Sequence, residues 1–269
     1  MPPKRPPLPR EHGAWAMLVL PLVLGALAAR TVTAASLLIL PATVLLFLAR
    51  FAPMGGTRAR RRGAGRPPLD PGRLTWSVIY LAASAACLAA AVALAPPDRR
   101  PAAVAIAAVT GALGTANAVL VLAGKGRSAG AELLAMSAVA LTAPLVLVLA
   151  GHPAGGLGAG LAVLCLAYFL STMSFVRAFR VLGEPEAAPR AVVGCLVTHA
   201  LLVVGLAAAW KAGWIPVLLL AAFVPVLART LVGLMRPPRS LAALGRREIG
   251  VSVTLLALAG VALLGGTPG

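Results

Sequence analysis

The stretch LTWSVIYLAASAACLAAAVALA, residues 74–95, runs for 22 residues without a charged side chain. An α-helix rises about 1.5 Å per residue, so this stretch is long enough to cross the roughly 30 Å hydrocarbon core of a membrane. Eight further apolar runs accompany it, at residues 14–29, 33–51, 101–123, 130–150, 155–176, 190–210, 214–234 and 249–265. The sequence therefore predicts an integral membrane protein with about nine transmembrane helices.

The composition of the whole chain supports the same class. Hydrophobic residues make up 60% of the 269 residues and charged residues 12%, with a mean hydropathy of +0.94. No alternation of apolar and polar residues recurs over segments of about 10 residues, so a membrane barrel is not supported and helices remain. We expect one all-α transmembrane domain over residues 1–269, with a Pro-rich arm at 1–9 and a long basic loop at 52–73.

The charges are distributed unevenly between the two sides. The chain has 24 Lys and Arg residues against 7 Asp and Glu, a net charge of +17. The N-terminal segment and every second connection after it carry 20 of the basic residues, and the connections in between carry 4. The positive-inside rule then predicts a multi-pass protein of the bacterial cytoplasmic (inner) membrane, with the N-terminus in the cytoplasm and the C-terminus outside. The charge is explained by topology and by attraction to anionic lipid headgroups, so nucleic acid is not an expected partner.

Polar residues within the apolar runs favour their cytoplasmic halves. With the topology above, these residues surround the inner ends of several helices, where a cavity open to the cytoplasm would be entered. Candidate catalytic groups are His12 and Glu132, since both can titrate. Candidate substrate-binding residues are Arg50, Arg66, Asn117, Ser174 and Arg177.

Each of these residues also has a purely structural interpretation. Glu11 and His12 stand at a helix start beside Trp15, where capping and interfacial anchoring explain them equally well. Glu132 is suited to N-terminal capping and to a local ion pair. Arg177 is suited to reaching the headgroup region from a helix end.

His199 lies near the middle of the run at 190–210, and we expect it to be the one ionisable side chain that cannot easily reach either surface. It is either a neutral histidine bonded to the backbone or a proton-linked residue.

Metal chemistry has little support in the sequence. Cys87, Cys165 and Cys195 are single residues in apolar runs, without the paired spacing of a metal site or a disulfide framework. The three His residues are scattered, so no metal site is predicted.

The segment EHGAWAM at residues 11–17 resembles the opening of the YwiC-like family of bacterial integral membrane proteins. GKGRSAGAELLAMSAVALTAP (124–144) and STMSFVRAFR (171–180) are similar to later segments of the same family. This resemblance implies an integral membrane protein and by itself points to no particular reaction.

A more distant resemblance is to the UbiA-type intramembrane prenyltransferases, through the stretch that begins GRPPLDPGRLTWS at residue 65 and through the nine-helix topology. It implies a UbiA-like bundle with an inner active site and a Mg²⁺-bound diphosphate. The first Asp-rich motif of those enzymes should precede this stretch, but FLARFAPMGGTRARRR (47–62) has no carboxylate. Because carboxylates hold the metal, a Mg²⁺ cofactor is doubtful and the cofactor is left open.

Three functions follow from these observations. The first is a cytoplasm-facing cavity for an amphipathic anionic small molecule, such as a prenyl phosphate or a quinone precursor. The second is a membrane transporter in which His199 is linked to protons. The third is a structural role in which the basic loops dock a partner. Whether the protein is an enzyme is left open by the sequence.

Overall fold

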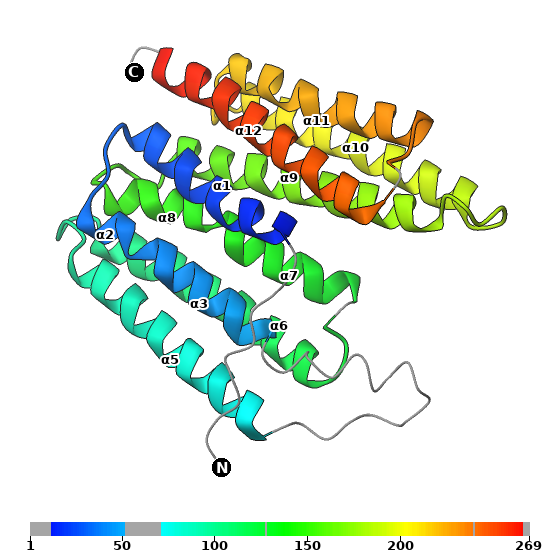
Figure 1. The fold of residues 1–269 in the computed structure, drawn as a ribbon. Helices are drawn as coiled ribbons and strands as arrows, with labels where there is room; N and C mark the ends of the chain where they lie inside the picture. Colours follow the sequence, from blue (N-terminus) through cyan, green and yellow to red (C-terminus); the bar gives the residue numbers. More distant parts are fainter. Residues whose placement is uncertain (1–11, 52–70, 127, 239, 266–269) are drawn as a thin grey trace.

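The computed structural model describes residues 12–51, 71–126, 128–238 and 240–265, and every element within these ranges is a helix. The helices lie side by side as one bundle (Figure 1). Their bounds are α1 (His12–Ala29), α2 (Ala34–Leu37), α3 (Ile39–Phe51), α5 (Pro71–Ala93), α6 (Arg100–Leu122), α7 (Ala129–Ala140), α8 (Thr142–Leu149), α9 (Gly156–Val181), α10 (Ala188–Lys211), α11 (Val217–Met235) and α12 (Leu241–Gly265). The prediction of an all-α fold is confirmed.

Seven helical segments are long and apolar enough to cross a membrane, and two shorter apolar segments, Trp15–Ala29 and Ala34–Arg50, accompany them. The chain is therefore a multi-pass membrane protein. The seven long segments and the two shorter ones lie where the nine apolar runs are in the sequence.

Two of the predicted spans are interrupted, each at a single residue. Leu38 separates α2 from α3, and Leu141 separates α7 from α8. Each break lies three residues before a proline, Pro41 or Pro144. Proline has no backbone N–H and its ring crowds the carbonyl four residues earlier, so a break at this distance is its expected effect.

The central helix of the bundle is α8, whose eight residues are all buried. On one side a cluster around Tyr168, Phe169 and Phe223 joins α1 and α9 to α10, α11 and α12. On the other side a cluster around Ile39 and Ala91 joins α8 to α2, α3, α5 and α6. The two halves of the protein thus share α8 as a common wall (Figure 1).

Small residues allow close approach where α9 meets the turn before α11. A Cβ atom on Gly156 would lie 2.8 Å from the Trp214 ring, and one on Gly160 would lie 2.7 Å from the Trp214 carbonyl oxygen. Glycines at this four-residue spacing therefore let α9 approach the neighbouring segment closely.

Neighbouring helices alternate in direction, so basic residues gather at one end of the bundle (Figure 1). We call this end, which carries the end of α3 and the starts of α5 and α7, the basic end. Its described basic residues are Arg50, Lys125, Arg177, Arg180, Arg190, Arg236, Arg246 and Arg247. The opposite end has Arg30, Arg99, Arg100 and Lys211.

Two boundaries differ from the sequence prediction. The helix expected to start at residue 249 begins at Leu241, so Glu248 lies inside α12. The loop expected over 52–73 ends earlier, because α5 begins at Pro71. The rest of that loop and the arm at 1–9 lie outside the described residues.

The expectation that His199 alone is an ionisable group remote from the surface is wrong. Arg229 lies within α11 and is 8% exposed, and Glu248 is 6% exposed, against 5% for His199. The physical reason is mutual neutralisation, since a buried charge is tolerated where an opposite charge pairs with it.

Candidate functional site

A cavity of about 450 Å³ lies between α3, α5, α6 and the α7–α8 segment. It is bounded by two helix pairs, because α5 packs along α3 and α6 packs along α7. One hydrogen bond ties each pair together. Ser84 Oγ donates to the Ala42 carbonyl at 2.7 Å, and Asn117 Nδ2 donates to the Ala131 carbonyl. The cavity is the space left between these two pairs.

The cavity carries its charge at the basic end. Arg50, in the last turn of α3, lines it, and its Nη2 donates to the Gly126 carbonyl at 3.1 Å. Ser77 of α5 and Asn117 of α6 line the same region, so one cation and two neutral polar groups surround this part of the cavity.

The deeper walls are apolar, with Ile39, Leu46, Leu88 and Leu145 among the lining residues. Most hydroxyls along these walls are bonded to backbone carbonyls, as when Thr142 Oγ1 donates to Val139 at 2.7 Å. The cavity is therefore amphipathic along its length: it is polar at the basic end and apolar deeper in the bundle.

Thr110 is a buried hydroxyl on these walls that lacks such a bond. It is 8% exposed and lines the cavity, and within the described chain its Oγ1 has no hydrogen-bond partner. An unpaired buried hydroxyl destabilises a protein by about 1–3 kcal/mol, but this oxygen is covered by its neighbours, so a molecule in the cavity reaches it only after the Thr110 side chain rotates.

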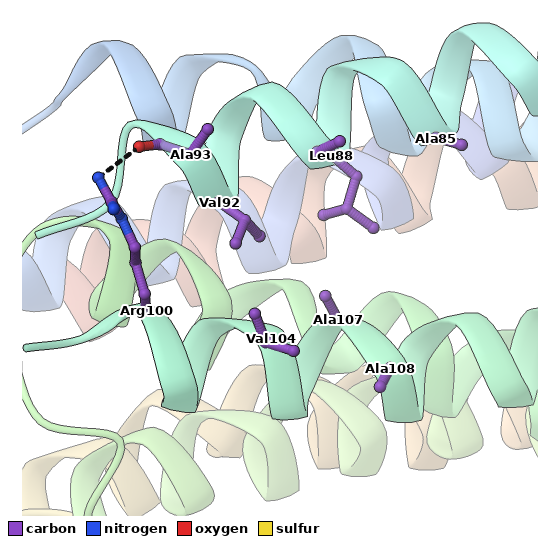
Figure 2. Close-up of a pocket in the computed structure, with 9 residues that line it drawn as sticks. Ala85, Leu88, Val92, Ala93, Arg100, Val104, Ala107 and Ala108 are labelled. Atoms are coloured by element: carbon purple, nitrogen blue, oxygen red, sulfur yellow. Dashed lines mark hydrogen bonds between the residues drawn. The ribbon is translucent and has the colours of Figure 1, made fainter. Parts of the chain in front are cut away.

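A groove of about 580 Å³ adjoins the cavity between α5 and α6 (Figure 2). Its walls are mostly small side chains from both helices, and Arg100 lies at its far end (Figure 2). Ala85 and Leu88 line both the groove and the cavity, so the two spaces share part of the α5 wall.

A second polar cluster is buried among α9, α10, α11 and α12. Arg229 Nη1 lies 3.0 Å from Glu248 Oε1, although the two groups are not aligned as a hydrogen bond. Arg229 Nη2 donates to Ser171 Oγ at 3.0 Å, and Thr172 Oγ1 donates to Glu248 Oε2 at 3.1 Å. The Arg229 guanidinium also lies 4.8 Å from the centre of the Phe175 ring, a cation–π distance. The buried pair thus links three helices.

His199 extends this cluster onto α10. Its Nδ1 lies 2.7 Å from the Cys195 carbonyl, which only accepts, so Nδ1 carries the proton of the neutral ring. Nε2 then accepts from Ser171 Oγ at 2.7 Å, while Ser171 Oγ itself accepts from Arg229. Thr230 Oγ1 lies 2.8 Å from the same Nε2. His199 is therefore bonded within the bundle on both ring nitrogens.

The residues predicted for one site lie in three places. Arg50 and Asn117 share the cavity. Glu132 and Arg177 form an ion pair of 2.7 Å at the basic end, with side chains 29% and 43% exposed. Ser174 Oγ donates to the Ser171 carbonyl at 3.0 Å, next to the buried cluster.

The two remaining candidates lie outside what the structure describes. His12 is the first residue of α1, but its side chain is not among the described parts, and Arg66 lies between the described ranges. Their roles stay predictions.

Arg229, Glu248 and Thr110 were not among the residues predicted from the sequence. Arg229 lies five residues before the end of the apolar run at 214–234, and a charged residue at that depth was detectable in the sequence. Glu248 directly follows Arg246 and Arg247, and such a run of charged residues is typical of a loop. Thr110 had no signal, because threonine is common in apolar helices.

Metal ligands do not gather in the described part of the chain. Within it, no group of three or more His, Cys, Asp or Glu side chains is placed to hold an ion. Cys87, Cys165 and Cys195 are all free thiols.

Comparison with known proteins gives one match. No curated protein and no solved structure matches the chain. Residues 8–147 match the family described as YwiC-like protein, more than half of the chain. All residues that line the cavity fall within the matched segment, whereas the cluster around Arg229 lies beyond it. The chain belongs to the YwiC-like protein family.

Proposed function

We propose that the cavity between α3, α5, α6 and α7 binds an amphipathic anionic molecule such as a prenyl phosphate or a quinone precursor. The observation that carries this proposal is the arrangement of the walls, with Arg50 at the basic end and apolar side chains deeper in. A ligand of this kind has one charged end and one apolar end, so it fits the cavity in a single direction.

The polar groups suit an anionic headgroup. The guanidinium of Arg50 offers planar, paired donors that match phosphate or carboxylate oxygens. Ser77 and Asn117 add neutral hydrogen-bonding groups nearby. Because the lining is mostly apolar, a charge-assisted bond from Arg50 is stronger there than in bulk water.

The other predicted residues have supporting roles in this proposal. Arg177 adds positive charge near the entrance and Glu132 supplies a titratable group there, and the same roles are expected from the sequence for Arg66 and His12. Arg177 is paired with Glu132, so it contributes to ligand binding only by exchanging that partner. The concentration of basic residues at this end supports a cytoplasmic entrance in the inner membrane.

Replacing Arg50 with glutamine is expected to weaken binding of farnesyl monophosphate by about 10- to 100-fold, the loss that follows from removing a charge-assisted hydrogen bond. The measurement is titration of the purified protein in detergent, read by native mass spectrometry. Arg180→Gln removes a similar charge from the basic end at an exposed position outside the cavity and serves as the control. Equal affinities for the two variants would contradict the proposal.

A transporter with His199 linked to protons is the second candidate. The observation that favours it is the buried cluster, in which hydrogen bonds join His199 to Ser171 and Ser171 to Arg229, and an ion pair joins Arg229 to Glu248, across four helices. Buried ionisable groups of this kind are typical of proton and substrate pathways through membranes.

For this candidate we expect His199→Ala to abolish the pH dependence of solute flux in reconstituted vesicles while the protein still elutes as a folded species. His152→Ala is the matched control, because His152 lies away from the cluster, with Nε2 3.1 Å from the Ala29 carbonyl. A flux that kept its pH dependence in His199→Ala would remove His199 from the mechanism.

A further inference from the structure

We infer that the apolar chain of the ligand leaves the cavity between α5 and α6 and runs along the groove towards the opposite end of the bundle. The site then selects lipids whose chain is longer than the depth of one membrane leaflet. This inference rests on the proposed function, since the charged end of the same molecule is the group placed at Arg50.

The first support is that the cavity and the groove share part of one wall. Ala85 and Leu88 belong to the walls of both the cavity and the groove. A chain that starts among the apolar cavity walls therefore passes into the groove without crossing a polar barrier. Figure 2 shows Ala85 and Leu88 of α5 leading to Val92 and Ala93, with Val104 and Ala107 of α6 across the gap.

The second support is length. Along α5 the combined walls extend from Leu74 in the cavity to Ala93 in the groove. At 1.5 Å per residue this is about 28 Å, against about 15 Å for half of the hydrocarbon core. A molecule that fills both spaces thus has a chain nearly as long as the membrane is thick.

The third support is that α5 and α6 remain apart although they follow one another in the chain. Each packs on a different partner, and contact between the two is slight. Small side chains such as Ala85 and Ala107 would allow them to close up, as helices in lipid do through packing. An apolar chain between them supplies the dispersion contacts that the open walls lack.

The far end of the groove is closed by Arg100. Its Nη2 donates to the Ala93 carbonyl at 2.9 Å (Figure 2), and its Nε donates to the Ala95 carbonyl at 3.1 Å. Both bonds hold the guanidinium against the end of α5. The apolar path therefore ends where the headgroup region of the opposite leaflet begins.

The test uses three probes with one headgroup, namely geranyl, farnesyl and undecaprenyl monophosphate, titrated into the full-length protein. We expect the undecaprenyl probe to bind about tenfold more tightly than the farnesyl probe. Ala85→Phe places a ring where the cavity meets the groove, so it should abolish the difference in affinity between the undecaprenyl and farnesyl probes. Ala86→Phe is the control, because Ala86 is exposed on the same helix but lines neither space.

A second variant tests whether the loss of affinity depends on where the groove is narrowed. Val104→Phe narrows the groove beyond the junction, so the affinity gain with chain length should be reduced less than in Ala85→Phe. Val104 is 53% exposed, so the change is not expected to disturb the fold.

The outcomes separate the inference from the function on which it rests. Affinity that does not depend on chain length, or equal behaviour of Ala85→Phe and Ala86→Phe, would overturn the inference and leave the groove to bulk lipid. Failure of all three probes to bind, with no effect of Arg50→Gln, would instead overturn the proposed function.

Discussion

Replacing Glu248 with leucine is expected to lower the free energy of unfolding by about 3–5 kcal/mol, because it leaves the Arg229 cation buried without its partner. The Glu248 side chain is 8% exposed and the Arg229 side chain 4%, so water cannot replace the lost carboxylate. The measurement is unfolding of the purified protein by a denaturing detergent, followed by circular dichroism. Arg229→Met should be destabilising for the same reason.

The double variant Arg229→Met, Glu248→Leu should be more stable than either single variant. It removes both charges, and a buried pair replaced by apolar side chains is often close to neutral. The exposed pair of Arg177 and Glu132 is the control. There, Glu132→Gln should lower the free energy of unfolding by no more than about 1 kcal/mol. Additive losses in the double variant would mean that the buried charges do not act as a pair.

Replacing Gly160 with alanine is expected to lower the free energy of unfolding by about 1–3 kcal/mol, although alanine is the better helix former. The added methyl group would meet the Ile215 side chain and the Trp214 carbonyl, and a backbone atom cannot rotate away. Either α9 or the turn before α11 must move. Thermal unfolding monitored by tryptophan fluorescence measures this change, since Trp214 lies at the contact.

Gly194→Ala is the matched control for this prediction. Gly194 is also inside a helix, but a methyl group there meets nothing within 4 Å. Gly194→Ala should therefore raise the free energy of unfolding by up to about 1 kcal/mol, because alanine has the higher helix propensity. If both variants shifted the unfolding temperature in the same direction, close packing at Gly160 would not be the controlling factor.

The class of fold follows from properties that each short segment carries by itself. Apolar runs of 16 to 23 residues are visible without any tertiary information, and lipid leaves helices as the structure that satisfies their backbones. The breaks at Leu38 and Leu141 each precede a proline, Pro41 or Pro144, but Pro21 and Pro225 lie inside unbroken helices, so a proline alone did not locate the breaks. The boundary of α12 was not predicted either, because Arg246, Arg247 and Glu248 resemble a loop when they are considered alone.

The candidate site was only partly foreseeable. Arg50 and Asn117 stood out as polar residues near helix ends, and the structure places both at one cavity. Glu132 and Arg177 stood out for the same reason, yet they lie against each other outside the cavity lining. Depth along a helix is encoded in the local sequence, whereas the direction in which a side chain points depends on how the helix is rotated against its neighbours.

The sequence by itself determined that this is a helical membrane protein with its basic residues gathered on alternate connections, because hydropathy and charge are local quantities. Tertiary structure alone decided which polar groups meet. Arg229, Glu248, Ser171 and His199 come from four helices, and no spacing in the chain relates them. Nor does any spacing open a path between α5 and α6, since that depends on each helix having packed against a different partner.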